Sequence, residues 1–90
     1  MSTAIQIVPV TPADRAPAEA LLREAGLPLA GLEDHWADFL AARTAEGTLV
    51  GLIGLERYGE AGLLRSLVVA PSHRGQGIGR RLIETLFQRC

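Results

Sequence analysis

The spacing of hydrophobic positions changes several times along this chain, and each spacing predicts one element of secondary structure. Weakly alternating apolar residues in "AIQIVPV" (4–10) predict a first strand that ends at the following "TP". Apolar runs in "FLAAR" (39–43), "TLVGLIGLERY" (48–58) and "LLRSLVVAP" (63–71) predict three more strands. The turn-forming stretches "TAEG" and "YGEAG" separate these three runs, so we expect them to form an antiparallel meander.

Three other segments have the spacing of helices. In the first, Asp14 is a suitable N-cap, Pro17 fits the first turn, and Gly26 fits the position after the last turn. The second is short and places Leu32 and Trp36 on one side. The last helix has an apolar face formed by five residues: Ile78, Leu82, Ile83, Leu86 and Phe87. The predicted order is strand, helix, helix, three strands, helix, which is an α+β fold with a mixed sheet.

Composition narrows the class of protein. Ninety residues form at most one domain, and 48% hydrophobic residues with 21% charged residues are typical of a globular chain. The net charge of −1 lacks the basic excess of proteins that bind nucleic acid or membrane surfaces, so we expect neither partner. Cys90 is the only cysteine and cannot form an internal disulfide, which favours the cytoplasm. Residues 1–6 do not resemble a signal peptide, and no metal-ligand spacing occurs.

The joint between the last predicted strand and the last helix carries unusual chemistry. The stretch "VVAPSHRGQGIGRR" (68–81) contains glycines at 75, 77 and 79 and ends on two arginines. Amides at the N-terminus of a helix form an anion site, and glycines let a phosphate approach them closely. Arg80 and Arg81 would oppose the helix dipole on their own, but they are favourable beside a multiply charged phosphate. We therefore expect a phosphate-bearing ligand at this loop.

Two familiar phosphate-binding motifs are excluded by the residues present. The P-loop ends in Gly-Lys-Ser/Thr, and this chain contains no lysine. The dinucleotide fingerprint requires a glycine where Arg80 stands, and it requires a parallel βαβ unit. RNA binding through "RGQG" is disfavoured because no aromatic residue interrupts the loop.

The arrangement Arg74-x-x-Gly77-x-Gly79 resembles the signature of the GNAT superfamily of acyl-CoA-dependent N-acyltransferases, which is Gln/Arg-x-x-Gly-x-Gly/Ala. In that family the signature follows the fourth strand and opens the third helix, as "LLRSLVVAPSHRGQGIGRRLIETL" does here. The stretches "GLPLAGLEDHW", "GLERYGEAGLLRSL" and "FLAAR" are also similar to arsenic-resistance N-acetyltransferases. The resemblance implies that acetyl-CoA is the co-substrate and that the acceptor is the amine of a small molecule.

The resemblance also assigns roles to residues around the loop. Main-chain groups would contact the pantetheine arm and the acyl carbonyl at three strand residues: Leu67, Val68 and Val69. Backbone amides would hold the pyrophosphate along the loop and the first helical turn: Arg74, Gly75, Gln76, Gly77, Ile78, Gly79 and Arg80. Arg74, or Arg80 together with Arg81, would add charge pairing.

Two interpretations of Arg65 remain open on the sequence alone. Arg65 could line the acceptor site and pair with an anionic group of the substrate, or it could be an ordinary charge on an edge strand. We expect Trp36 to be a core anchor, and His35 to be a surface or hydrogen-bonded residue rather than a base.

No catalytic base or acid can be assigned. Several family members place a glutamate on the fourth strand, where this chain has leucines at positions 63 and 64. Glu56 and Glu60 are the nearest carboxylates, and either could simply be solvated. Proximity and an oxyanion donor such as the amide of Val69 could then supply much of the rate.

The chain matches only the first part of the family fold. Residues 1–90 would be the N-terminal portion of one domain, which lacks the fifth strand, the following helix and the last strands. The strand over 63–70 would then have an unpaired edge, through which a homodimer could form. Three hypotheses follow: an acetyltransferase, a half-domain that binds CoA without turnover, and a truncated chain that completes its sheet by pairing.

Overall fold

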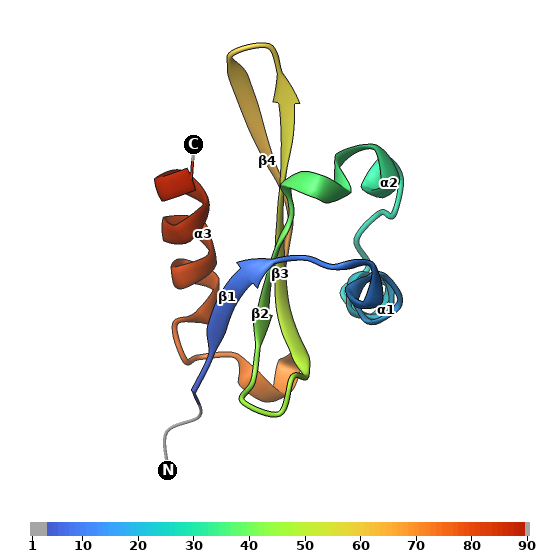
Figure 1. Cartoon of the computed structure of the whole chain (residues 1–90). Helices are drawn as coiled ribbons and strands as arrows, with labels where there is room; N and C mark the ends of the chain where they lie inside the picture. The colour runs from blue at the N-terminus through green and yellow to red at the C-terminus, as the bar shows by residue number, and fades with distance from the viewer. Residues whose placement is uncertain (1–3, 90) are drawn as a thin grey trace.

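The computed structural model describes residues 4–89, which form one four-stranded sheet with helices on both faces (Figure 1). The strands are β1 (Gln6–Pro9), β2 (Leu40–Arg43), β3 (Leu49–Tyr58) and β4 (Ala61–Val69). The helices are α1 (Arg15–Glu24), α2 (Leu32–His35) and α3 (Ile78–Arg89), and short 3-10 turns cover Pro12–Asp14, Trp36–Asp38 and Pro71–His73. The predicted α+β class and the order of elements are therefore confirmed, and within residues 4–89 the sheet is antiparallel rather than mixed. The expected first strand, 4–10, is shorter in the structure, and Cys90 lies outside the described residues.

The sheet order follows the chain, β1-β2-β3-β4, and every pair is antiparallel. One face is covered by α3 and the other by α1 and α2 (Figure 1). On the α3 side, Ile78, Leu82 and Leu86 pack against Val50 and Leu55 of β3. On the other side the buried residues come from α1, α2, β3, β4 and the position just before β2: Ala18, Leu21, Leu22, Leu32, Phe39, Leu52 and Val68. Burying these two apolar faces is the main force that holds the helices to the sheet.

Local signals explain where α1 begins and ends. Gly26 follows the helix with a φ of +71°, and the amide of Leu27 donates to the carbonyl of Leu22 at 2.9 Å. This pattern is a Schellman cap, so Gly26 has the role predicted for it. The helix also begins after Asp14 as expected.

The role predicted for the Asp14 side chain is wrong. Its carboxylate does not cap α1; it accepts a hydrogen bond from the amide of Thr11 at 2.7 Å and forms an ion pair with Arg43 of β2. Asp14 already has helical dihedral angles, φ −79° and ψ −12°, whereas an N-cap normally has extended ones. The side chain therefore points toward the sheet and is buried there.

Strand β4 carries a β-bulge. Leu52 pairs with Val68 and Gly54 pairs with Arg65, so two residues of β4, Ser66 and Leu67, lie opposite the single residue between them on β3. Ser66 adopts a φ of +58°, which is the left-handed region that residues with a Cβ rarely occupy. The hairpin of β3 and β4 extends past the helices (Figure 1), and β4 forms the edge of the sheet.

Candidate functional site

The loop after β4 turns the chain into α3. It consists of Ala70, the 3-10 turn Pro71–His73 and residues 74–77, and α3 begins at Ile78. Gly75 and Gly77 have φ values of +80° and +79°. A Cβ built on either glycine would meet nothing within 4 Å, so the backbone conformation, rather than lack of space, requires glycine here. The loop is open to solvent over residues 74–77.

The first turn of α3 presents backbone donors beside this loop. The amides of Ile78, Gly79 and Arg80 open the helix and have no acceptor four residues earlier within it, whereas the amide of Arg81 donates to Gly77 at 3.1 Å. The dipole of a twelve-residue helix adds partial positive charge at the same end. Loop and helix together therefore have the geometry of an anion site.

The three arginines of this region have different surroundings. The Nε of Arg74 donates to the carbonyl of Val69 at 3.1 Å, and an Nη of Arg81 donates to the carbonyl of Ile5 at 2.8 Å. Arg80 is exposed and forms no hydrogen bond or ion pair with the rest of residues 4–89. Two of the arginines thus brace the loop and the helix against the sheet, and Arg80 is the one whose guanidinium remains available.

The end of β4 exposes main-chain groups while its side chains are packed. Val68 is buried on the α1 side, and Leu67 and Val69 pack on the α3 side. The amide of Ala70 donates to Val50 at 2.8 Å. Because the direction of main-chain groups alternates along a strand, the amide and carbonyl of Val69 point away from β3 and toward the open edge.

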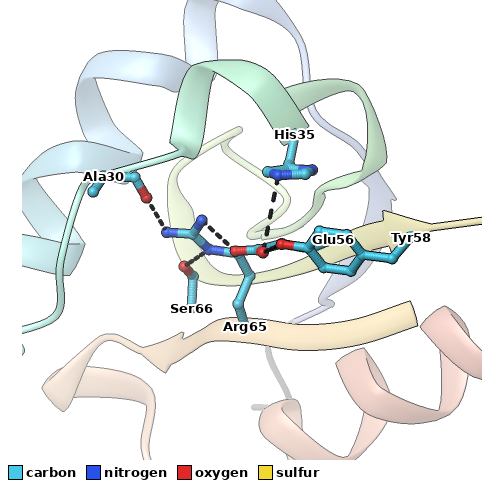
Figure 2. A network of polar contacts seen from close by, with 6 residues as sticks. All are labelled: Ala30, His35, Glu56, Tyr58, Arg65 and Ser66. Carbon is cyan, nitrogen blue, oxygen red and sulfur yellow. Dashed lines mark hydrogen bonds and ion pairs between the residues drawn. The ribbon is translucent and has the colours of Figure 1, made fainter. Parts of the chain in front are cut away.

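A polar network lies on the α2 side of the same strand, next to the bulge (Figure 2). Arg65 is at its centre: one Nη donates to Glu56 at 2.7 Å, the other donates to the carbonyl of Ala30 at 2.7 Å, and Nε donates to the hydroxyl of Ser66 at 3.0 Å. Its side chain is only 12% exposed. Arg65 therefore joins β3, β4 and the loop before α2, unlike an ordinary solvated charge on an edge strand.

Glu56 is the acceptor in this network. Tyr58 donates its hydroxyl to one carboxylate oxygen, Arg65 donates to the other, and Nε2 of His35 lies 3.9 Å away. The hydrogen bond from Tyr58, together with the bond and charge of Arg65, outweighs desolvation and lowers the pKa of Glu56 below its usual range. The same bond raises the pKa of Tyr58, because losing the phenol proton would place two anions together. Glu56 is therefore a stable carboxylate at neutral pH.

Beside the network is a cleft of about 280 Å³. It is lined by residues of the α1–α2 loop and of strands β3 and β4: Leu27, Pro28, Ala30, Glu56, Arg65 and Ser66. The structure thus brings Arg65 and Glu56 together at one cavity, whereas Glu60 lies exposed in the β3–β4 turn.

The two aromatic positions singled out in the sequence have separate roles. Trp36 packs against Phe39 with ring centroids 5.5 Å apart, and the guanidinium of Arg15 lies 5.4 Å from its ring. Trp36 is therefore an anchor at the border of the core, as predicted. His35 contacts the network, with its ring centroid 6.2 Å from that of Tyr58.

Sequence reasoning missed Tyr58 and Ala30. Tyr58 follows Glu56 by two positions on β3, so strand alternation alone would have placed both side chains on one face. The carbonyl of Ala30 has no signal in the sequence, because any residue offers the same main-chain acceptor.

The profile of the acetyltransferase (GNAT) family matches residues 9–90. This chain belongs to the GNAT acetyltransferase family. No curated protein matches the chain.

Several solved structures of the family are similar to this chain. N-acetylglutamate synthase from Neisseria gonorrhoeae, complexed with coenzyme A and N-acetyl-glutamate, is 26% identical over 99% of this chain, with a TM-score of 0.80. Diaminobutyrate acetyltransferase from Paenibacillus lautus, in complex with L-2,4-diaminobutyric acid and coenzyme A, is 26% identical over 96% of the chain, with a TM-score of 0.79. A GNAT-family acetyltransferase from Staphylococcus aureus shares the fold over 97% of this chain, at a TM-score of 0.83 and 20% identity.

The chain spans only part of each of these proteins: 23% of the synthase, 58% of the diaminobutyrate enzyme and 66% of the staphylococcal protein. Within residues 4–89, no helix is long and apolar enough to cross a membrane, and no three His, Cys, Asp or Glu side chains are grouped to hold a metal ion.

Proposed function

We propose that this chain forms the acetyl-CoA-binding part of an N-acetyltransferase that acetylates the amine of a small molecule. The observation that carries the proposal is the glycine loop at the N-terminus of α3, which directly follows a bulged strand within a match to the GNAT family over residues 9–90. The coenzyme A named with the Neisseria and Paenibacillus structures supports the co-substrate, and their amino-acid ligands support an amine acceptor.

The pyrophosphate of acetyl-CoA would bind to amides of the loop and first helical turn, from Arg74 to Arg80. The positive φ of Gly75 and Gly77 and the open space around both support this role. Arg80 would supply charge pairing, since its guanidinium is exposed, while Arg74 and Arg81 each donate to a main-chain carbonyl. The main chain of Leu67, Val68 and Val69 would contact the pantetheine arm.

In the transfer step the ammonium first loses a proton to solvent, and the neutral amine then forms a C–N bond with the acetyl carbonyl. The C–S bond to coenzyme A breaks, the nitrogen loses a second proton, and the thiolate leaves and takes up a proton. The amide of Val69 points to the open edge of β4 and could donate to the oxyanion that develops on the carbonyl. No residue is assigned as base or acid. The lowered pKa of Glu56 makes it a weak proton acceptor at neutral pH, because an efficient base has a pKa near the working pH.

Calorimetric titration of acetyl-CoA into the 90-residue chain tests the proposal. We expect saturable binding that Arg80→Ala weakens about tenfold, the loss typical of one charge-assisted hydrogen bond. Arg89→Ala is the matched control, because it removes the same charge from the exposed last turn of α3. If the folded chain does not bind acetyl-CoA, the proposal is wrong for this molecule.

A second candidate is a CoA-binding half-domain without turnover. The support for this candidate is the length of the match, because the chain spans only 23% to 66% of the three structures compared. A thiol-release assay with a panel of small amines separates the two candidates, because binding without release of coenzyme A indicates the half-domain. Sedimentation shows whether the chain forms a homodimer, which is the state expected if the β4 edge pairs two copies.

We also propose a role in arsenic resistance and a cytoplasmic location. The first rests on the stretches similar to arsenic-resistance N-acetyltransferases, and the second on the single cysteine. The role in arsenic resistance is tested by comparing growth on an arsenical between cells that express the chain and cells that do not. Fractionation of the expressing cells tests the location.

A further inference from the structure

The cleft beside the β4 bulge has one carboxylate, one engaged guanidinium, a serine hydroxyl that accepts from that guanidinium, and three apolar residues. We infer that this cleft binds a small aliphatic amine that carries no carboxylate of its own, with the ammonium on Glu56. The inference rests on the proposed function and names the class of acceptor for the same site.

Glu56 has unused capacity to accept. A carboxylate offers about four lone-pair positions, and Arg65 and Tyr58 occupy two of them with one bond to each oxygen. His35 lies 3.9 Å from the nearer oxygen, which is beyond hydrogen-bond distance. The Glu56 side chain lines the cleft and remains 16% exposed. An ammonium entering the cleft can therefore reach this carboxylate without breaking the network.

Arg65, by contrast, cannot easily serve a carboxylate of the ligand. Three of its five N–H groups already donate to the protein, to Glu56, to the carbonyl of Ala30 and to Ser66, and the side chain is only 12% exposed. A Cβ on Gly31 would lie 2.8 Å from one Nη, which shows how closely the loop packs on the guanidinium. A ligand carboxylate would also meet the like charge of Glu56. Arg65 is thus a positioning residue that orients Glu56.

The rest of the lining suits an aliphatic body. Leu27 and Pro28 come from the loop that follows α1, and Leu27 is half-buried against the core below. The volume of about 280 Å³ exceeds that of an amine of five carbons. Contact with these two residues removes apolar surface of the ligand from water, so a hydrocarbon chain should bind more tightly than a polar one.

The test compares two ligands that differ only in the carboxylate, n-pentylamine and norleucine, which is pentylamine with a carboxyl group on the carbon that bears the nitrogen. Both are titrated into the isotopically labelled chain, and the amide signals of Ala30 and Ser66 are followed. We expect pentylamine to bind at least about tenfold more tightly than norleucine, with 1-pentanol weaker than pentylamine. Glu56→Gln should weaken pentylamine binding about tenfold by removing a charge-assisted bond.

Glu46→Gln is the matched control, since Glu46 is exposed in the β2–β3 turn, and it should leave binding unchanged. The ligand pair is compared in the unmutated chain, so the test stands even if Glu56→Gln does not fold. Norleucine binding as tightly as pentylamine, saturable binding of neither, or pentylamine signals that shift away from the cleft would each overturn the inference. Acetyl-CoA binding is measured separately, so failure of the proposed function and failure of this inference are distinguishable.

Discussion

The Nη of Arg65 lies 2.7 Å from the carbonyl oxygen of Ala30, which is 35 positions earlier in the chain. This bond fixes the loop between α1 and α2 against β4, while the other Nη of the same guanidinium holds Glu56. The shape of the cleft and the orientation of its carboxylate therefore depend on one side chain.

Replacing Arg65 should loosen that loop. Arg65→Met keeps much of the apolar stem and removes all three donated bonds, so we expect amide exchange over residues 27–31 to accelerate at least about tenfold while the α3 side stays protected. Arg65→Lys should restore little, because an ammonium cannot span Glu56 and Ala30 at once. Hydrogen exchange read by mass spectrometry provides the measurement, and unchanged exchange in Arg65→Met would contradict this role.

The Asp14–Arg43 pair should govern acid stability. Burial alone would raise the pKa of Asp14, but the bonds from Arg43 and Thr11 hold it below its usual range. The stability it contributes is therefore present above the pKa of the unfolded state and is lost as pH falls through the lower folded pKa. Arg43→Met should cost about 3 kcal/mol of unfolding free energy at pH 7, because it leaves a buried carboxylate unpaired.

Urea unfolding of the chain and of Asp14→Asn, measured between neutral pH and about pH 3, checks the sign of this effect. The difference in stability between the two proteins should shrink as the pH falls below the unfolded-state pKa of aspartate, about 3.9, because the unfolded chain then takes up a proton that folded Asp14 resists. A difference that stays constant with pH would show that the pair contributes no linked protonation.

The signature glycines should respond in opposite ways to alanine. Gly77→Ala places a Cβ at a φ of +79°, which should cost about 1–2 kcal/mol and weaken acetyl-CoA binding. Gly79 lies in the first turn of α3, where a Cβ would meet only Val69 at 3.8 Å. Gly79→Ala should therefore be stabilising, by up to about 1 kcal/mol, and should retain binding. Thermal melts and acetyl-CoA titrations of both variants test the contrast, which equal losses would refute.

Gly54 should be intolerant of any side chain. A Cβ at this position in β3 would overlap the ring of Phe39, which is 1% exposed. Gly54→Ala should therefore cost roughly 1–3 kcal/mol through overpacking. Gly51→Ala, on the same strand, meets its nearest atoms at 3.1 Å and should cost less. Equal unfolding midpoints in urea for these two variants would argue against the close contact.

The spacing of hydrophobic residues predicted the helices and strands, because each of them buries one face and the residues of that face recur at a regular interval. The Schellman cap at Gly26 was predictable for the same reason, since its signal lies within the helix and the residues that follow. The direction of the Asp14 side chain was not predictable from the sequence, because its partner, Arg43, is 29 positions away on β2.

For the candidate site, the loop glycines and arginines were visible in the sequence, whereas the network around Arg65 was not. Its formation depends on the left-handed conformation of Ser66, and a serine in a sequence does not predict a positive φ. It also depends on a main-chain carbonyl whose position only the tertiary fold determines.

The extra residue in β4 determines which face of the sheet each neighbouring side chain occupies. Arg65 and Val68 are three positions apart, and a regular strand would send them to opposite faces. Here Val68 is buried on the α1 side, and the guanidinium of Arg65 lies 6.0 Å from the ring of Phe39 in the same layer. If β4 were regular with all of its residues retained, Arg65 would turn toward α3, even though every side chain of the network remained in the sequence. The irregular backbone at Ser66 and Leu67 therefore decides which layer of the protein receives the guanidinium.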